Sequence, residues 1–288
     1  MRPVRRLRRT VLVAVASATL LASCSGSSTG SEPSGDTTAD GAVTTTAAPQ
    51  RHEAKVTTEA EVDGNYRQGL ARSGDGWIFV TNNAIYRTDA SFVQTDALHD
   101  AIPPDLAAQG YDHLGDPDVS EGLIWVPVER ADKDSGKQVT ARYDEETFEF
   151  VDSVEVEQHH NAFIGVGEDG TAYSADEFSD DVIVRYRITD GEVVPQEPLE
   201  LSRTVERIQG GDVIDGALWL STDDDHNGVY RVDLVTGEVQ DLGSAGHIEG
   251  EGEGIDATEL DGSTLHVLVA DAAIVPMYVT DLRVTASS

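Results

Sequence analysis

Residues 215–239, DGALWLSTDDDHNGVYRVDLVTGEV, hold three short runs rich in aliphatic, β-branched and aromatic residues, separated by turn signals. An Asn-Gly pair divides the first run from the second, and such a pair is the strongest short-range signal for a β-hairpin. A Thr-Gly-Glu turn then leads into the third run. The stretch therefore predicts consecutive antiparallel strands, because short runs of this composition bounded by turns are typical of strands.

The same arrangement recurs along the chain at intervals of 44 to 49 residues. The repeats are anchored at Gly69, Gly115, Asn161, Gly210 and Gly254. A β-rich segment follows each anchor, and three of these segments contain the tryptophans, Trp77, Trp125 and Trp219. The next segment of each repeat carries a tyrosine, namely Tyr86, Tyr143, Tyr186, Tyr230 and Tyr278. Four short strands in roughly 45 residues are typical of a β-propeller blade.

These repeats predict an all-β fold, in which residues 51–288 form a single propeller of five blades with four antiparallel strands each. The last repeat ends soon after its third strand, whereas residues 52–62, HEAKVTTEAEV, precede the first repeat and alternate like a strand. We expect this segment to supply the missing outer strand, so that the N- and C-terminal strands pair and close the ring. Six blades are the alternative if residues 96–112 contain degenerate strands.

The N-terminus resembles that of a bacterial lipoprotein. Five arginines precede the apolar run VLVAVASATLLA, which is too short to span a bilayer and fits a signal peptide. The following LASC, residues 21–24, resembles a lipobox, and this implies cleavage after residue 23 and acylation of Cys24 with palmitate-type chains. Cys24 is the only cysteine, so no disulfide forms within the chain. A plain secretory signal with an incidental cysteine is the alternative.

Residues 24–50 predict a tether, because they are rich in Ser, Thr, Gly, Ala and Pro and lack any apolar period. The mature chain is strongly acidic. Residues 1–23 hold five of the 20 basic residues and none of the 53 acidic ones, which leaves a formal net charge of −38 from Cys24 onward. Such a chain repels nucleic acid, and we exclude nucleic acid as a partner. The expected partner is the lipid membrane, through the acylated N-terminus on its extracytoplasmic face.

The propeller prediction places polar side chains in the central channel. In HIEGEGEGID, residues 247–256, a strand would put its alternating glutamates on one face. Glu251 and Glu253 are therefore expected to face the channel. Residues at the other anchors are polar as well and provide the candidate ligand-binding set, Gln68, His113, His160, Asn161 and Gln209. These groups either satisfy one another and a water column or hold a ligand.

A divalent cation is one expected occupant, because neighbouring carboxylates raise each other's pKa unless a cation or donors are present. Histidine with carboxylates suits zinc or manganese, whereas carboxylates with amides suit calcium. The candidate metal ligands are Glu251, Glu253, His113 and His160. Three aspartates lie close enough in the sequence to join them, Asp116, Asp118 and Asp212.

The segment DDDHNG is a second, weaker cation candidate. Asp223, Asp225 and Asn227 match the first half of a calcium-binding loop, but the closing position holds Leu234 in place of glutamate. An ordinary acidic hairpin turn is the alternative, because an Asn-Gly pair favours a turn between two strands.

With these residues in view, the chain resembles bacterial β-propeller lipoproteins of the broad group that includes gluconolactonase-like, strictosidine-synthase-like and phytase-esterase-like propellers. The resemblance rests on residues 215–239 and on EGEGIDATELDGSTLHVLV, residues 251–269, and loosely covers residues 63–288. In gluconolactonase-like members a channel metal held by acids and asparagines performs hydrolysis. Only Glu253 and Asn161 match that pattern, whereas Gln68, His113 and Gln209 depart from it.

Two functions are compatible with these features. One is a lipid-anchored binding or scaffolding module that recognises a small-molecule or protein ligand at the channel. The other is a metal-dependent hydrolase acting on lactones or phosphoesters, with His113, His160 or Glu251 as general base. We favour binding, because residues 51–288 contain neither an HExxH nor a GxSxG motif and the only cysteine is assigned to lipidation.

The lipid anchor gives a direct test. Replacing Cys24 with serine removes the acylated thiol, so the protein should appear in the culture medium instead of the membrane fraction. Immunoblots of the two fractions measure this, and a variant that stays in the membrane fraction would rule out the anchor.

Overall fold

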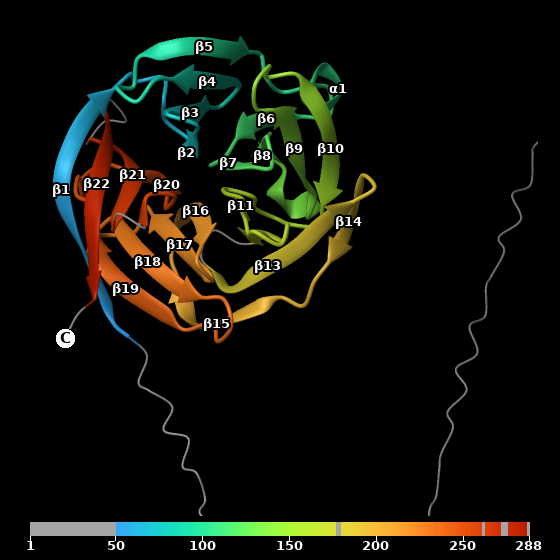
Figure 1. Cartoon of the computed structure of the whole chain (residues 1–288). Helices are drawn as coiled ribbons and strands as arrows, with labels where there is room; N and C mark the ends of the chain where they lie inside the picture. Colours follow the sequence, from blue (N-terminus) through green and yellow to red (C-terminus); the bar gives the residue numbers. More distant parts are fainter. Residues whose placement is uncertain (1–49, 177–179, 261–262, 272–275, 287–288) are drawn as a thin grey trace, which may run out of the picture. The chain divides into compact units, whose positions relative to one another are not determined.

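Five small antiparallel sheets surround a common centre, with their inner strands toward the middle and their outer strands at the rim (Figure 1). The computed structural model describes residues 50–176, 180–260, 263–271 and 276–286. The expected signal peptide, Cys24 and all but the last residue of the tether therefore lie outside the described residues. Helix is confined, in the part described, to α1 (Pro104–Ala107) and the 3₁₀ turn Lys133–Ser135. The all-β propeller prediction is confirmed.

In blades 1 and 4 the strands follow one another outward in chain order, whereas in blade 2 both β6 and β7 pair with β8 and in blade 3 both β14 and β15 pair with β13. Blade 1 contains β2 (Gly69–Ser73), β3 (Gly76–Thr81), β4 (Ala84–Thr88) and β5 (Gln94–His99). Blade 2 contains β6 (Tyr111–Leu114), β7 (Asp118–Ser120), β8 (Leu123–Arg130), β9 (Gln138–Asp144) and β10 (Phe150–Val156). Blade 3 contains β11 (Gly165–Val166), β12 (Ala172–Ala175), β13 (Asp180–Thr189), β14 (Glu192–Pro195) and β15 (Leu199–Val205). Blade 4 contains β16 (Ile208–Ile214), β17 (Ala217–Thr222), β18 (Gly228–Asp233) and β19 (Val239–Ser244).

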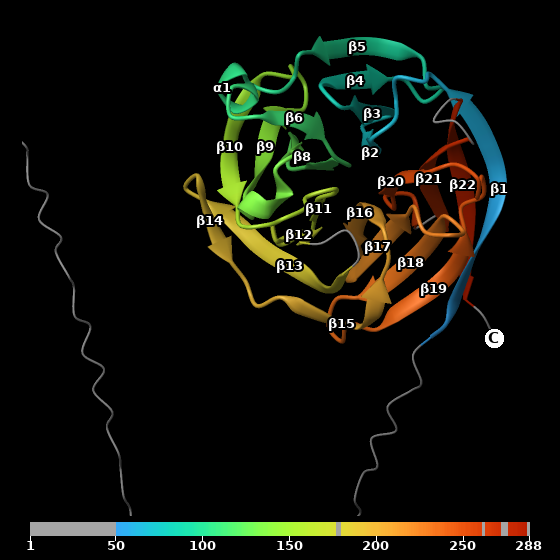
Figure 2. The ribbon, with the colours of Figure 1, turned by 180° about the vertical axis from the view of Figure 1, so that it is seen from behind.

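Blade 5 combines the two ends of the described chain. Its sheet has the order β1-β22-β21-β20, where β20 is Gly252–Asp256, β21 is Thr264–Ala270, β22 is Met277–Ala286 and β1 is His52–Val62. Strands β1 and β22 pair antiparallel from one end to the other (Figure 2). This closure by the predicted segment is confirmed. Residues 96–112 supply the end of β5, helix α1 and the start of β6, so the described chain has five blades.

Apolar side chains fill the seams between blades. Strand β3 is buried along five of its six residues, because both faces of the blade are covered by neighbours. The five hydrophobic clusters of the described residues each join two adjacent blades. Burial of apolar area at these seams is the main favourable contribution to the folding free energy. Strands such as β3 and β17 are therefore apolar on both faces, whereas outer strands such as β5 and β14 are largely exposed.

At the centre of the ring, the buried side chain of Asp116 connects the blades. One carboxyl oxygen accepts the N–H of Leu70 (3.0 Å), and the other accepts the N–H groups of Gly211 (3.0 Å) and Ile255 (3.3 Å). Its backbone carbonyl accepts the N–H of Ile164 (3.2 Å). Asp116 belongs to blade 2, and these four donors belong to the other four blades. One residue therefore bonds to every other blade.

Glycines let the other inner strands approach Asp116. A Cβ atom on Gly69 or Gly254 would lie within 2.4 Å of Asp116 atoms, and one on Gly210 would lie within 2.8 Å. Each of these glycines directly precedes a residue whose N–H group bonds to Asp116, and Phe163 does the same in blade 3. The structural repeat therefore runs through positions 69, 116, 163, 210 and 254, at intervals of 47, 47, 47 and 44 residues. The anchors chosen from sequence in blades 2 and 3 lie one and two residues too early. The reason is that blades 2 and 3 have Asp116 and Phe163 where the others have glycine.

Asp116→Ala should destabilise the whole ring. It removes the acceptor for three buried N–H groups, and each unsatisfied buried group costs about 1–3 kcal/mol, so we expect a loss of roughly 4 kcal/mol or more in urea unfolding. Exposed Asp225 provides the control, because Asp225→Asn should change the unfolding free energy by less than about 0.5 kcal/mol. Equal stability of the two variants would contradict the central role of Asp116.

Candidate functional site

One end of the channel gathers most of the predicted site residues. The inner strands run parallel around the channel, as the parallel bridge between Asp116 and Phe163 shows. Residues just before the level of Asp116 therefore lie at the same end, which we call the channel mouth. From their places in the chain relative to the level of Asp116, we assign to the channel mouth Arg67, Gln68, His113, Glu129, Lys133, His160, Arg207, Gln209, Asp223, Glu251 and Glu253.

Blades 2 and 3 contribute a connected polar cluster to the channel mouth. Glu129, near the end of β8, pairs in register with His113 of β6 and is 4% exposed. Its carboxylate lies 2.5 Å from Nδ1 of His160 and 2.5 Å from Nζ of Lys133, and it also accepts the N–H of Asn161. Lys133 Nζ in turn lies 2.9 Å from His160 Nδ1. Glu129 is thus satisfied by protein groups on both oxygens.

The protonation of this cluster follows from its contacts. Burial alone would raise the pKa of Glu129, but the hydrogen bond from His160 and the positive charges of His160 and Lys133 outweigh burial and lower the pKa to about 2. Burial lowers the pKa of His113, and the charge of Glu129 opposes that change. Nδ1 of His113 also lies 3.2 Å from the amide nitrogen of Asn82. An ionised Glu129 beside an ammonium group is therefore the stable state near neutral pH.

Blades 5 and 1 contribute a different kind of group, Glu253 with Glu251 and Arg67. Glu253 is 5% exposed, and no hydrogen bond from a described residue reaches its carboxyl oxygens. Burial and the negative charge of Glu251 raise its pKa well above the usual value, whereas Arg67 lowers it. The Glu253 carbonyl, by contrast, accepts the hydroxyl of Ser221. The backbone of Glu253 is therefore fixed while its carboxyl group faces the channel mouth without a donor.

The amide side chains have unequal roles. Asn161 is fully buried, its Nδ2 donates to the carbonyl of Val139 (3.0 Å), and its Oδ1 accepts the hydroxyl of Ser174 (3.0 Å). Its side chain therefore connects strands and is not presented to a ligand. Gln68 donates to the carbonyl of its neighbour Arg67, and Gln209 is half-buried. These two glutamines keep free oxygens at the channel mouth.

The three weaker cation candidates, Asp223, Asp225 and Asn227, lie in the hairpin between β17 and β18. Asp223 forms an ion pair with Arg207, Asp225 is exposed, and Asn227 donates through Nδ2 to the carbonyl of His247 (2.9 Å). Asn227 has a φ of 49°, in the left-handed region that an Asn-Gly turn requires. The neighbouring Asp224, which was not among the candidate cation ligands, accepts the N–H of Gly228 and the hydroxyl of Tyr230. The contacts found here are those of a turn.

The candidate metal ligands are divided between these groups. His113 and His160 lie in the cluster around Glu129, where the Lys133 ammonium already supplies a cation. Glu251 and Glu253 lie with Arg67. Among the described residues, no three His, Cys, Asp or Glu side chains are placed to share one metal ion. A complete protein ligand set is therefore not assembled, and a cation at Glu251 and Glu253 would need other oxygen ligands.

Below the channel mouth, three further aspartates join adjacent blades. Asp118 of blade 2 accepts the N–H of Val166 in blade 3 (2.6 Å). Asp212 of blade 4 accepts the N–H of Ala257 in blade 5 (2.6 Å). Asp256 of blade 5 accepts the N–H of Arg72 in blade 1 (2.7 Å). Each therefore fixes one seam through a single hydrogen bond, and we call the three the seam aspartates.

Sequence reasoning named Asp118 and Asp212 only as possible metal ligands and missed Asp256, Glu129 and Lys133. One signal was available for the seam aspartates. Each lies two residues after a position that meets at the centre, as in DPD (116–118), GGD (210–212) and GID (254–256). For Glu129 and Lys133 we find no comparable signal, because they come from the second strand of blade 2 and the loop after it.

The strand pairing defines the protein as a five-bladed β-propeller. Comparisons with known proteins add little to that: no family model and no curated protein matches the chain. Among solved structures the chain is similar to hydrazine synthase of Kuenenia stuttgartiensis, with a TM-score of 0.46 and 13% identity, over 80% of this chain and 66% of that chain. The chain thus spans just under two thirds of that protein's length. In the described part, neither helix is long and apolar enough to cross a membrane.

The seam aspartates predict a pH dependence of stability. Burial raises the pKa of Asp118 from 3.8 to about 7, the charge of Asp256 adds to this, and the N–H of Val166 opposes it. Between these two pH values the folded state keeps a proton that the unfolded state has lost. Stability from Asp118 is therefore largest in acid and falls as the pH rises through this window.

Asp118→Asn removes this titration and keeps an oxygen for Val166. The unfolding free energy, measured in urea from pH 4 to pH 7, should decline less steeply in this variant than in the unmodified protein. Asp225→Asn, in an exposed loop, should leave the slope unchanged. The same slope in both variants would show that Asp118 does not titrate in this range.

Proposed function

We propose that this protein is a lipid-anchored binding module on the extracytoplasmic face of the cell membrane, and that its channel mouth binds a small cationic group. The observation that carries the proposal is the buried Glu253 carboxyl group, which no hydrogen bond from a described residue reaches. Burying such a group without donors is costly. A bound cation would offset that cost and favour the ionised form.

The charge around Glu253 supports a cation. At the channel mouth Lys133 is paired with Glu129, and Arg207 is paired with Asp223. Arg67 is then the only remaining basic side chain of the channel mouth to offset Glu251 and Glu253. The formal net charge of −33 for the whole chain attracts cations from solution as well. An anionic ligand would meet the opposite field.

Binding accounts for these residues better than hydrolysis does. Two of the predicted general bases have Nδ1 engaged, since His160 Nδ1 contacts both Glu129 and Lys133 and His113 Nδ1 lies beside Asn82. The third, Glu251, lies near the carboxyl group of Glu253. A general base must have a free lone pair within reach of the proton it takes. We therefore place recognition, not bond cleavage, at the channel mouth.

Thermal denaturation tests the proposal. The purified full-length protein is melted near pH 7 with calcium, manganese or zinc ions and, separately, with the organic diamine putrescine. A ligand that binds only the folded state stabilises it by RT ln(1 + [L]/Kd), about 2.7 kcal/mol at a hundredfold excess over Kd. At least one probe should raise the melting temperature, and the effect should fade in acid as Glu253 is protonated. The probe that succeeds distinguishes a metal site from an ammonium site.

Two variants locate the effect. Glu253→Gln should abolish most of the increase, whereas Asp225→Asn in the hairpin loop should keep it. If no probe raises the melting temperature, or if the increase survives Glu253→Gln, the channel mouth does not bind a cation. An increase lost only in Asp225→Asn would place the cation in the loop at residues 223–228.

A further inference from the structure

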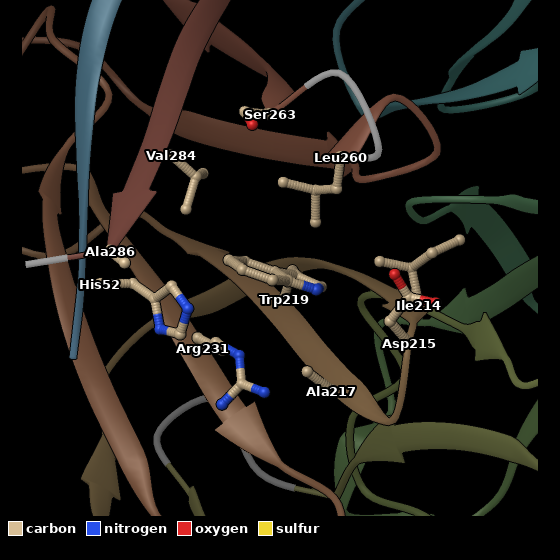
Figure 3. Close-up of a pocket in the computed structure, with 10 residues that line it drawn as sticks. All are labelled: His52, Ile214, Asp215, Ala217, Trp219, Arg231, Leu260, Ser263, Val284 and Ala286. Carbon is tan, nitrogen blue, oxygen red and sulfur yellow. The ribbon is translucent and has the colours of Figure 1, made fainter. Parts of the chain in front are cut away.

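A second cavity lies at the seam between blades 4 and 5, at the far end of β16 from the channel mouth (Figure 3). Its volume is about 330 Å³, within the range of small-ligand pockets. Its polar lining comes from His52, Asp215, Arg231 and Ser263, and its apolar lining comes mainly from Ile214, Trp219, Leu260 and Val284. Because β16 runs from the channel mouth to this cavity, the two sites are separate.

Trp219 forms the floor of this cavity. It is 6% exposed, and within the described chain its indole N–H has no hydrogen-bond partner. In Figure 3 the ring lies between Leu260 and Val284 on one side and Arg231 on the other. A buried donor without an acceptor is unusual in a folded protein and costs about 1–3 kcal/mol. An acceptor brought by a ligand would satisfy it.

Blade 2 provides a comparison, because Trp125 holds the same place there. Trp125 also lacks a partner for its N–H, so this feature alone does not distinguish the two sites. Both tryptophans also pack in apolar clusters that join two adjacent blades, Trp125 between blades 2 and 3 and Trp219 between blades 4 and 5. The two sites therefore differ in their polar lining and not in their apolar packing.

The arginine that lies over each tryptophan differs between the two blades in its ion pairing. Arg142 lies over Trp125 at 5.0 Å and forms a two-pronged ion pair with Asp152, at 2.8 and 2.6 Å. Arg231 lies over Trp219 at 5.7 Å, but its cross-strand neighbour is Gln240, and it forms no ion pair with any carboxylate in the described ranges. The Arg231 guanidinium thus keeps its donors for another acceptor.

Charge and hydrogen-bonding capacity together define the ligand. The indole N–H and Arg231 donate, Asp215 accepts, and the hydroxyl of Ser263 does both. An anion would be repelled by Asp215 and by the acidic chain, whereas a cation would be repelled by Arg231. Hydroxyl groups both donate and accept without charge, and they match this mixed lining.

We propose that this cavity binds a neutral pyranose sugar, with its hydroxyl groups on Arg231, Asp215 and Ser263 and one of them toward the indole N–H of Trp219. The cavity is large enough for one or two sugar rings. This function is independent of the cation at the channel mouth.

Binding of defined sugars tests the proposal. The purified full-length protein is titrated with D-glucose, D-galactose, D-mannose, N-acetyl-D-glucosamine and maltose. Saturation-transfer NMR and tryptophan fluorescence report the binding. At least one sugar should bind with a Kd in the millimolar range or below. Trp219→Ala should weaken it at least tenfold, and Arg231→Gln about fivefold or more, because hydrogen bonds from charged donors are the stronger ones.

Matched variants in blade 2 serve as controls. Trp125→Ala makes the same change at the equivalent tryptophan and should leave the sugar affinity within about twofold, as should Arg142→Gln. Arg231→Gln also covers the case in which Trp219→Ala fails to fold, because Arg231 is only half-buried. The proposal is overturned if no sugar of the panel binds, if binding survives in both cavity variants, or if benzoate binds there and the sugars do not.

Discussion

The structure depends on one carboxylate at its centre. Asp116 receives N–H donors from every other blade, and only glycine allows three of those blades to come close enough. Burial raises the pKa of Asp116 well above its usual value, while the backbone donors lower it. The N–H groups that bond to Asp116 offset part of the free-energy cost of burying its carboxyl group. Asp116 therefore sets the level at which the inner strands of the described blades meet.

The arrangement of blades was predictable because it repeats. Each repeat has a tyrosine in its third predicted strand, and three repeats have a tryptophan in the second. These residues identify the blades in the sequence even when the packing of the side chains is not known. The closing strand was predictable for a different reason, since residues 52–62 alternate like a strand and the last repeat lacked one. Both inferences use local sequence, and both describe strands, which local sequence largely determines.

The candidate site was less predictable, because it depends on register and on contacts between blades. His113 and His160 were expected at the channel, but the carboxylate between them comes from Glu129, whose place follows from the pairing of β8 with β6. Asn161 was expected to face a ligand, yet its amide is used by Val139 and Ser174. Asp116 was visible as an acidic residue near the channel. Its role required knowing that three distant backbone segments converge on it.

The closure of the ring also imposes an order in time. Of the strands in the described chain, β1 is synthesised first and its partner β22 last. Blade 5 therefore stays incomplete until the whole domain is available, and β1 must wait unpaired beside the growing chain. Its sequence suits that wait, because Glu53, Lys55, Glu59 and Glu61 put charge along an edge that would otherwise attract other strands. The joining of the two chain ends therefore cannot precede the synthesis of β22, and any event that frees β1 reopens the ring at that one seam.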